Sequence, residues 1–396
     1  MLLLLVVIYL AFISLGLPDA ILGAAWPTMG TSIQAPLEFA GVLSFLMSLG
    51  TVISSLLTAH LLNRFGIGKV VAFSVLLTAS ALLGFSLSHQ VLTLALLSVP
   101  LGIGAGAVDS ALNNFVALNY RAKHMNYLHS FWGVGATAGP LIMANYLMLD
   151  NGWRQGYETI ALLQFGLVFI LFISLPLWKS ALSKNTSNEA ESPIFISNKQ
   201  ALKKTGVSLQ LALFFCYCAL ELGTGLWAAS YLTIERGILA QDAAFWTAMF
   251  YLGITIGRFL CGVIADKFNE ESMIRFGILS ILVGALALIL PLPALVSQLG
   301  LALIGLGCAP IFPNTLHLTP KRFGKAASQA VIGLSIATAY VGITLVPPLM
   351  GALLTNLSFS YFPLLLLLLG LGMLFTSERL KRVNQNGESI KALGET

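Results

Sequence analysis

The stretch Leu2-Leu-Leu-Leu-Val-Val-Ile-Tyr-Leu-Ala-Phe-Ile-Ser-Leu-Gly-Leu-Pro-Asp19 carries no charge before its last residue, and the apolar character continues to Trp26. A helix needs roughly 20 apolar residues to cross the hydrocarbon core of a bilayer, so this segment predicts a membrane-spanning helix. An ionisable group at that depth is costly in lipid and normally faces a protein interior or a water-filled cavity. We therefore expect Asp19 to mark a functional cavity.

The rest of the chain is also strongly apolar. Of its 396 residues 57% are hydrophobic and only 9% are charged, against roughly 25% charged in a soluble domain. The sequence predicts an all-α integral membrane protein. Twelve apolar segments are expected near residues 2–28, 38–62, 69–89, 92–118, 127–148, 157–178, 208–232, 242–265, 273–290, 294–317, 326–352 and 359–377.

The distribution of basic residues predicts the orientation of these helices. Every Lys and Arg except Arg154, Arg236 and Arg258 falls on the same side as the N-terminus when the segments alternate across a membrane. Basic loops stay in the cytoplasm, so both termini are expected there, in a bacterial inner (plasma) membrane crossed many times. The same short basic loops give no reason to expect nucleic acid. The partners expected are membrane lipid and a small solute, and the protein is expected to be a monomer.

The chain divides into two similar halves. We expect a six-helix bundle over residues 1–178, a flexible cytoplasmic linker over 179–206, a second six-helix bundle over 207–378, and a disordered cytoplasmic tail over 379–396. The loop Ala59-His-Leu-Leu-Asn63-Arg64-Phe65-Gly66 matches Gly262-Val-Ile-Ala-Asp266-Lys267-Phe268-Asn269. Nearly the same offset relates Asp19 to Glu221 and Trp26 to Trp227. Two such repeats with a site between them are typical of secondary transporters.

These two loops resemble the signature of the major facilitator superfamily, Gly-x-x-x-Asp-Arg/Lys-x-Gly. The resemblance implies the twelve-helix major facilitator fold, built from two pseudo-symmetric bundles. It also implies a gating or structural role for the loop residues Asn63, Arg64, Asp266 and Lys267. The first loop departs from the signature, because Ala59 replaces Gly and Asn63 replaces Asp.

Within that superfamily, several segments resemble the fucose permease-like sugar:proton symporter family. The matching stretches are Gly16-Leu-Pro-Asp19, Gly102-Ile-Gly-Ala-Gly106-Ala-Val-Asp109-Ser-Ala-Leu-Asn113-Asn114, Asn126-Tyr-Leu-His129-Ser-Phe-Trp132-Gly-Val-Gly135 and Glu221-Leu-Gly-Thr-Gly-Leu-Trp227. In that family an acid in the first helix and an acid in the fourth are implicated in proton coupling and sugar binding. Asp19 and Asp109 stand at the corresponding positions.

The residues themselves also point to proton coupling. Only Asp19, Asp109, Glu221 and Arg258 are charged residues that lie well inside the twelve segments. A carboxylic acid in a low-dielectric site holds its proton more readily than in water, so such groups can bind and release protons near neutral pH. We expect the three acids to couple protons to transport. The alternative is that each is a structural acid hydrogen-bonded between helices.

Other polar and aromatic residues are candidates for solute binding. Amides, acids and aromatic faces suit the hydroxyl groups and C–H surfaces of sugars. Trp26 and Trp227 are equally typical of interfacial anchors, and His129 of a helix cap. Arg258 shares a helix face with Asp266 and is expected in a structural ion pair or gate. The expected substrate contacts are Asn113, Asn114, His129, Trp132, Trp26, Trp227 and Asn314.

Together these features predict a proton-coupled secondary transporter that takes up a sugar or a similar small polar solute by alternating access. The alternative is a proton-coupled exporter of amphipathic compounds or sugar-lipids, which the many Phe residues and Gly139-Pro140 would suit. No nucleotide-binding loop precedes a soluble helix, so an ATP-driven pump is not expected. No metal or nucleophile constellation is evident either, so an enzyme is not expected. No cofactor or metal is expected; the proton gradient supplies energy, with sodium as the other coupling ion considered.

Overall fold

The computed structural model describes residues 2–120, 122–182, 197–264 and 267–394, and these ranges are helical apart from short connections. The first half contains α1 (Leu2–Asp19), α2 (Ile21–Ser32), α3 (Phe39–Phe65), α4 (Ile67–Leu87), α5 (Val91–Asn119), α6 (Ala122–Tyr146), α7 (Gly152–Ile173) and α8 (Leu175–Leu182). The second half contains α9 (Asn198–Leu202), α10 (Val207–Arg236), α11 (Ala240–Ile264), α12 (Glu270–Ile289), α13 (Ala294–Cys308), α14 (Ile311–Phe323), α15 (Lys325–Asn356), the short 3-10 helix η1 (Phe359–Tyr361) and α16 (Phe362–Gly394).

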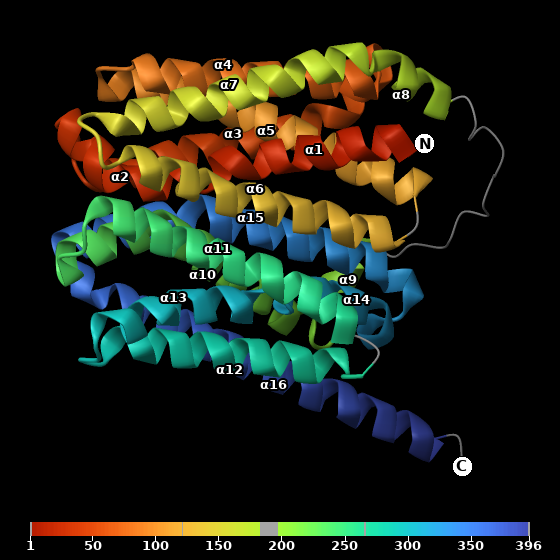
Figure 1. The fold of residues 1–396 in the computed structure, drawn as a ribbon. Coiled ribbons are helices and arrows are strands. Elements are labelled where there is room, and N and C mark those ends of the chain that lie inside the picture. The colour runs from red at the N-terminus through yellow and green to blue at the C-terminus, as the bar shows by residue number, and fades with distance from the viewer. Residues whose placement is uncertain (1, 121, 183–196, 265–266, 395–396) are drawn as a thin grey trace.

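The helices run side by side across the molecule (Figure 1). Among the described residues, eleven segments are long and apolar enough to cross a membrane, with α1–α2 and α13–α14 each counting as one. Helix α6 runs alongside them and completes the predicted set of twelve. The all-α, twelve-helix fold expected from the sequence is therefore confirmed. We call the face that carries the N-terminus, α8 and α9 the terminal face, and the other end, where α2 lies, the opposite face (Figure 1).

The first membrane segment is broken where its acidic residue lies. Helix α1 ends at Asp19 and α2 begins at Ile21. Pro18 has no N–H to donate to the carbonyl four residues before it. That carbonyl, of Ser14, instead accepts a 2.8 Å hydrogen bond from Nε2 of Gln164 on α7. The break therefore leaves no unpaired carbonyl at Ser14, and it places Asp19 at a helix end.

Glycines allow the helices within each half to approach closely. A Cβ at Gly50 of α3 would lie 2.8 Å from the carbonyl oxygen of Val99 on α5. In the second half, a Cβ at Gly253 of α11 would lie 2.8 Å from the backbone nitrogen of Leu306 on α13. Such contacts leave no room for a side chain, so these helix pairs pack backbone against backbone, as small-residue interfaces in membranes do.

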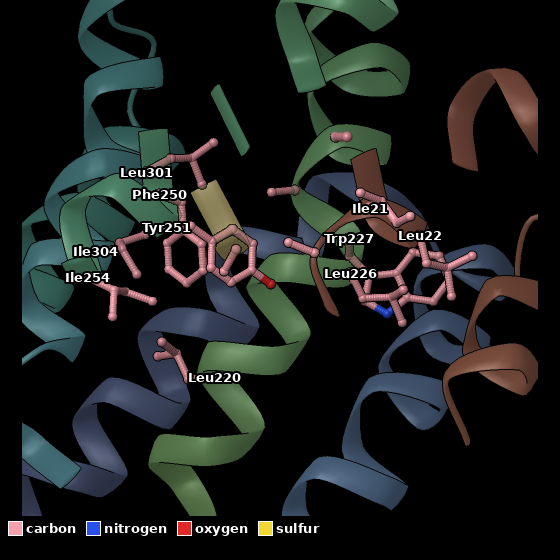
Figure 2. Close-up of a cluster of buried hydrophobic side chains, with 14 of the residues drawn as sticks. Ile21, Leu22, Leu220, Leu226, Trp227, Phe250, Tyr251, Ile254, Leu301 and Ile304 are labelled. Carbon is pink, nitrogen blue, oxygen red and sulfur yellow. The ribbon is translucent and has the colours of Figure 1, made fainter. Parts of the chain in front are cut away.

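The two halves touch each other near the opposite face. A Cβ at Gly23 of α2 would lie 2.8 Å from Cα of Leu226 on α10, and one at Gly41 of α3 would lie 2.7 Å from Cα of Pro348 on α15. Ile21 and Leu22 of α2 lie beside Leu226 and Trp227 of α10 in the same buried cluster (Figure 2). This packing closes the molecule at the opposite face.

The structure corrects the sequence prediction for the tail. Residues 379–394 were expected to be disordered, yet α16 continues to Gly394. Leu380 is fully buried in a small cluster with Ala201, Val207 and Phe323. Lys381 also lies 3.8 Å from the carboxylate of Glu271 on α12. These contacts fix the first turn beyond the membrane segment, which the polar composition alone does not reveal.

The predicted flexible linker over 179–206 is partly helical as well. Helix α8 extends to Leu182, and α9 is capped by Ser197, whose hydroxyl accepts from the backbone N–H of Gln200. Serine followed three residues later by Gln forms a capping box, which stabilises a short helix. The expectation of flexibility for residues 183–196 lies outside the described residues.

Candidate functional site

Two cavities lie between the halves in the middle of the molecule. The central cavity has a volume of about 270 Å³ and is lined by Asp19 and Trp132 from the first half and by Tyr251 and Tyr340 from the second. The terminal-side cavity has a volume of about 370 Å³. It is lined by parts of α1, α6, α11 and α14 that lie nearer the terminal face. The residues lining both cavities are Asp109, Trp132, Glu221, Leu222 and Ile343.

Asp19 occupies the break between α1 and α2 and its side chain is exposed to the central cavity. Its Oδ2 atom accepts a 2.7 Å hydrogen bond from Nε1 of Trp132 on α6. Helices α1 and α6 pack tightly at this level, because a Cβ at Gly16 would lie 2.7 Å from the backbone nitrogen of Ala136. The close packing fixes the position of the indole relative to the carboxylate.

The same indole also contacts a cation from the other half. The guanidinium carbon of Arg258 on α11 lies 5.3 Å from the ring centroid of Trp132, within the range of a cation–π interaction. Nη2 of Arg258 lies 3.7 Å from Oε1 of Glu221 on α10. Trp132 therefore links Asp19 of the first half to the Arg258–Glu221 ion pair of the second.

The charges that line the cavities do not balance. Three carboxylates, Asp19, Asp109 and Glu221, face one guanidinium, that of Arg258. Among the described residues, Arg258 forms an ion pair with Glu221 and with neither of the other two acids. Asp19 and Asp109 have neutral donors instead, since Oδ1 of Asp109 accepts a 2.8 Å hydrogen bond from Nδ2 of Asn113. An uncompensated negative charge away from bulk water is costly, so these two acids favour the arrival of a cation.

Several residues predicted from the sequence line the terminal-side cavity. His129 and Asn314 lie in its wall together with Arg258. The backbone carbonyl of His129 accepts a 3.5 Å hydrogen bond from Nη1 of Arg258. The imidazole ring of His129 packs edge-on against the ring of Phe12. Nδ2 of Asn314 is buried and makes no hydrogen bond within the part of the chain that the structure describes.

Two predicted substrate contacts on α5 lie outside both cavities. Asn113 donates to both the side chain and the backbone carbonyl of Asp109, so its amide positions that acid. Asn114 is exposed and is not part of either cavity wall. Adjacent residues point in different directions on a helix, so both could not share the face of Asp109.

The two tryptophans of the pseudo-repeat also lie away from the cavities. Trp26 and Trp227 are both fully buried. Nε1 of Trp26 donates a 2.8 Å hydrogen bond to the carbonyl of Leu37, and Nε1 of Trp227 donates a 2.8 Å hydrogen bond to that of Pro347. Trp227 lies among apolar side chains (Figure 2). In this structure both indoles therefore act as packing residues, and neither is part of the wall of either cavity.

The predicted gating residues lie at the terminal face. Asn63 and Arg64 are exposed at the end of α3, and the guanidinium of Arg64 lies over the ring of the adjacent Phe65 at 5.3 Å. Lys267 is exposed after α11. Asp266 lies outside the described residues. Arg258, which was expected in an ion pair or gate, pairs with Glu221 inside the protein.

Sequence reasoning missed five hydroxyl-bearing residues of the central cavity: Ser44, Ser48, Thr51, Tyr251 and Tyr340. The two serines are four residues apart on α3, which places them on one helix face. That spacing inside an apolar segment was the available signal. The two tyrosines carry no comparable pattern, because a single Tyr in a membrane segment is equally typical of lipid-facing and cavity-facing positions.

Comparison with known proteins places the chain in a family. The model of the major facilitator superfamily matches residues 8–334. The glucose/mannose transporter GlcP of Bacillus subtilis is 23% identical over 354 residues, which cover 87% of this chain and 86% of that protein. The nucleoside transporter NupG superposes with a TM-score of 0.75 at 11% identity, over 96% of this chain and 98% of its own. A D-xylose-proton symporter gives a TM-score of 0.69 at 18% identity, over 93% and 96% of the two chains. The chain belongs to the major facilitator superfamily.

Proposed function

We propose that this protein is a secondary active transporter that takes up a sugar together with protons by alternating access. The observation that carries the proposal is the position of Asp19. It is a carboxylate in the central cavity, bonded to Trp132, which also contacts Arg258 of the other half. The Bacillus subtilis relative is named a glucose/mannose transporter, which supports a sugar as the solute.

The charge pattern supports cation coupling at Asp19 and Asp109. Glu221 is paired with Arg258, whereas the hydrogen-bond donors that the described residues offer to Asp19 and Asp109 are neutral. A proton that binds Asp19 or Asp109 removes a negative charge from the cavity and so lowers the cost of burying it. Glu221 gains less from a proton, because protonation would leave Arg258 without its partner. We therefore assign proton coupling to Asp19 and Asp109, and charge compensation to the Glu221–Arg258 pair.

The closed opposite face supports a state that releases solute toward the terminal face. Gly23 and Gly41 bring the halves together at the opposite face. On the terminal side of Trp132 the cavity widens, and a Cβ at Gly262 in its wall would meet nothing within 4 Å. In the proposed cycle, Asp19 is protonated when the opposite face is open, and solute and proton leave toward the terminal face after the halves rock.

The energetics suit accumulation of a small solute. One proton that enters down a membrane potential of 100 mV supplies about 2.3 kcal/mol, enough for roughly fiftyfold accumulation. The orientation proposed, with the terminal face in the cytoplasm of a bacterium, follows from basic residues there such as Lys204, Lys267 and Arg379. Basic residues stay on the cytoplasmic side of bacterial membranes.

The polar groups of the central cavity favour a sugar over the amphipathic compounds of an exporter. The central cavity has a volume of about 270 Å³ and shares five wall residues with the terminal-side cavity of about 370 Å³. The wall of the central cavity also presents Asp19, Asp109 and several hydroxyl groups. A sugar can form hydrogen bonds with several of these groups at once, which an amphipath with few polar atoms cannot.

The proposal is tested with the purified protein in liposomes. Radiolabelled glucose, mannose, galactose and xylose are offered with an inward proton gradient, an inward sodium gradient or no gradient. We expect one or more of these sugars to accumulate with the proton gradient, and accumulation to collapse when a protonophore is added. Accumulation with the sodium gradient alone would show that sodium, and not the proton, is the coupling ion. Efflux of amphipathic dyes without any sugar uptake would contradict the proposal in favour of the exporter.

A further inference from the structure

The wall of the central cavity contains two serines whose hydroxyls have no hydrogen-bond partner among the described residues. Ser44 and Ser48 both line the cavity from α3. Residues four apart on a helix have Cβ atoms about 5–6 Å apart on the same face. The two hydroxyls therefore form a short polar row along one side of the cavity.

These serines differ from most other hydroxyl residues of the membrane helices. A Ser or Thr in a helix usually donates to the carbonyl three or four residues before it. Thr51 donates to Met47 at 3.0 Å, Thr58 to Ser54 at 2.7 Å and Ser80 to Leu76 at 2.8 Å. Ser44 and Ser48 make no hydrogen bond within the part of the chain that the structure describes.

Close packing holds α3 in place behind this row. A Cβ at Gly102 of α5 would lie 2.9 Å from Cα of Met47, and Oγ1 of Thr51 donates a 3.2 Å hydrogen bond to the carbonyl of Gly102. Toward the opposite face, Gly41 contacts Pro348 of the second half. The backbone that carries the serines is thus held against both halves. A preorganised group loses little entropy when it binds a ligand.

The chemistry of the row fits neighbouring hydroxyl groups of a ligand. A serine hydroxyl both donates and accepts hydrogen bonds, as a sugar hydroxyl does, whereas an ionised carboxylate only accepts. With hydrogen bonds of about 2.7–2.8 Å, two adjacent ring hydroxyls can each reach one of two serines that lie about 5–6 Å apart. The carboxyl group of Asp19 lines the same cavity, and its carbonyl oxygen can accept from a further hydroxyl even when the group is protonated.

We propose that Ser44 and Ser48 form a diol subsite that binds two neighbouring hydroxyls of one sugar ring and selects against sugars lacking either. This inference rests on the proposed function, since it names the groups by which the cavity recognises its solute. A site built to bond a hydroxyl discriminates strongly against an analogue without it, because the polar partner is then left unpaired. The subsite thus determines which sugar binds, and it does so independently of the protonation of Asp19.

Equilibrium binding to the purified protein tests the subsite without any transport step. The probes are glucose, mannose, galactose and xylose, followed by the single-position deoxy analogues of the sugar that binds best. Ser44→Ala and Ser48→Ala should each weaken the parent sugar about two- to tenfold. Each variant should bind one deoxy analogue as tightly as the wild-type protein binds it. Alanine favours a helix, so both variants are expected to fold.

The matched control is Ser80→Ala on α4, which removes an exposed hydroxyl already bonded to its own helix. It should leave the dissociation constant of the parent sugar unchanged. Equal affinity of the Ser44, Ser48 and Ser80 variants would overturn the diol subsite while sugar binding by the wild-type protein persists. The same loss for every deoxy analogue would overturn it too. If the wild-type protein binds none of the sugars, the subsite and the proposed function both fail.

Discussion

Nε1 of Trp132 donates a 2.7 Å hydrogen bond to Oδ2 of Asp19, and the face of the same indole lies 5.3 Å from the guanidinium carbon of Arg258. One side chain thus connects an acid of the first half with a cation of the second. A change in the charge of Asp19 changes its hydrogen bond with Trp132, and Trp132 in turn contacts Arg258 of the second half. In an alternating-access protein, this is where a proton can influence how the two halves meet.

Replacement of Trp132 by Phe should separate the two contacts of the indole. The ring that faces Arg258 remains, but the ionised carboxylate of Asp19 loses the donor that the structure gives it. A hydrogen bond to a charged group contributes about 1.5–3 kcal/mol, so proton-driven uptake should fall by roughly tenfold or more. Exchange of labelled for unlabelled sugar, which needs no net proton movement, should change less. Proton-driven uptake at the wild-type rate would show that the hydrogen bond has no part in coupling.

The Glu221–Arg258 pair should behave as a buried ion pair. The two side chains are only 8% and 16% exposed. Glu221→Gln or Arg258→Gln alone leaves one uncompensated charge and should destabilise the protein by about 3–5 kcal/mol. The double variant leaves none and should recover most of that loss. Thermal unfolding in detergent measures all three. A double variant that loses as much stability as the two single variants combined would contradict the pairing.

Gly23 should control closure at the opposite face. A side chain at this position would collide with the backbone of Leu226 on α10. Gly23→Val should therefore favour the alternative state by about 1–3 kcal/mol, the usual cost of overpacking. Cys261 lines the terminal-side cavity and reports on that state. In a Cys216→Ser background, labelling of Cys261 by N-ethylmaleimide should slow roughly five- to hundredfold.

Gly166→Val is the control for Gly23→Val. A Cβ at Gly166 of α7 would meet nothing within 4 Å, so this variant adds the same side chain without a collision. Its labelling rate should match that of the wild-type protein. If the Gly23 and Gly166 variants label alike, the contact between α2 and α10 does not hold the opposite face closed.

The sequence was sufficient for the fold because the signal is long and repeated. Uncharged runs such as Leu2–Leu17 specify spanning helices through length and composition alone. It was also sufficient to bring Asp19, Asp109, Glu221 and Trp132 to one place, since charged residues in lipid must share a protected cavity. The positions of Arg258 and Glu221 in the sequence did not reveal that the two residues pair, because that contact depends on how α10 and α11 pack.

Two kinds of residue misled the reading of the sequence. Trp26 and Trp227 match in the pseudo-repeat, but the match reflects equivalent packing positions, each with its indole N–H bonded to a carbonyl. The polar residues after Arg379 suggested disorder, whereas Leu380 is buried against Val207 and Phe323. In both cases a tertiary contact, which no local pattern encodes, determines the outcome.

Uphill uptake by Asp19→Asn in liposomes tests the central claim most directly. Asparagine keeps the size of the side chain and an oxygen that can accept from Trp132, but it cannot exchange a proton. With an imposed proton gradient, the variant should fail to accumulate the sugar that the wild-type protein concentrates, yet should still exchange labelled for unlabelled sugar. Accumulation by Asp19→Asn to the wild-type level would contradict the assignment of proton coupling to Asp19.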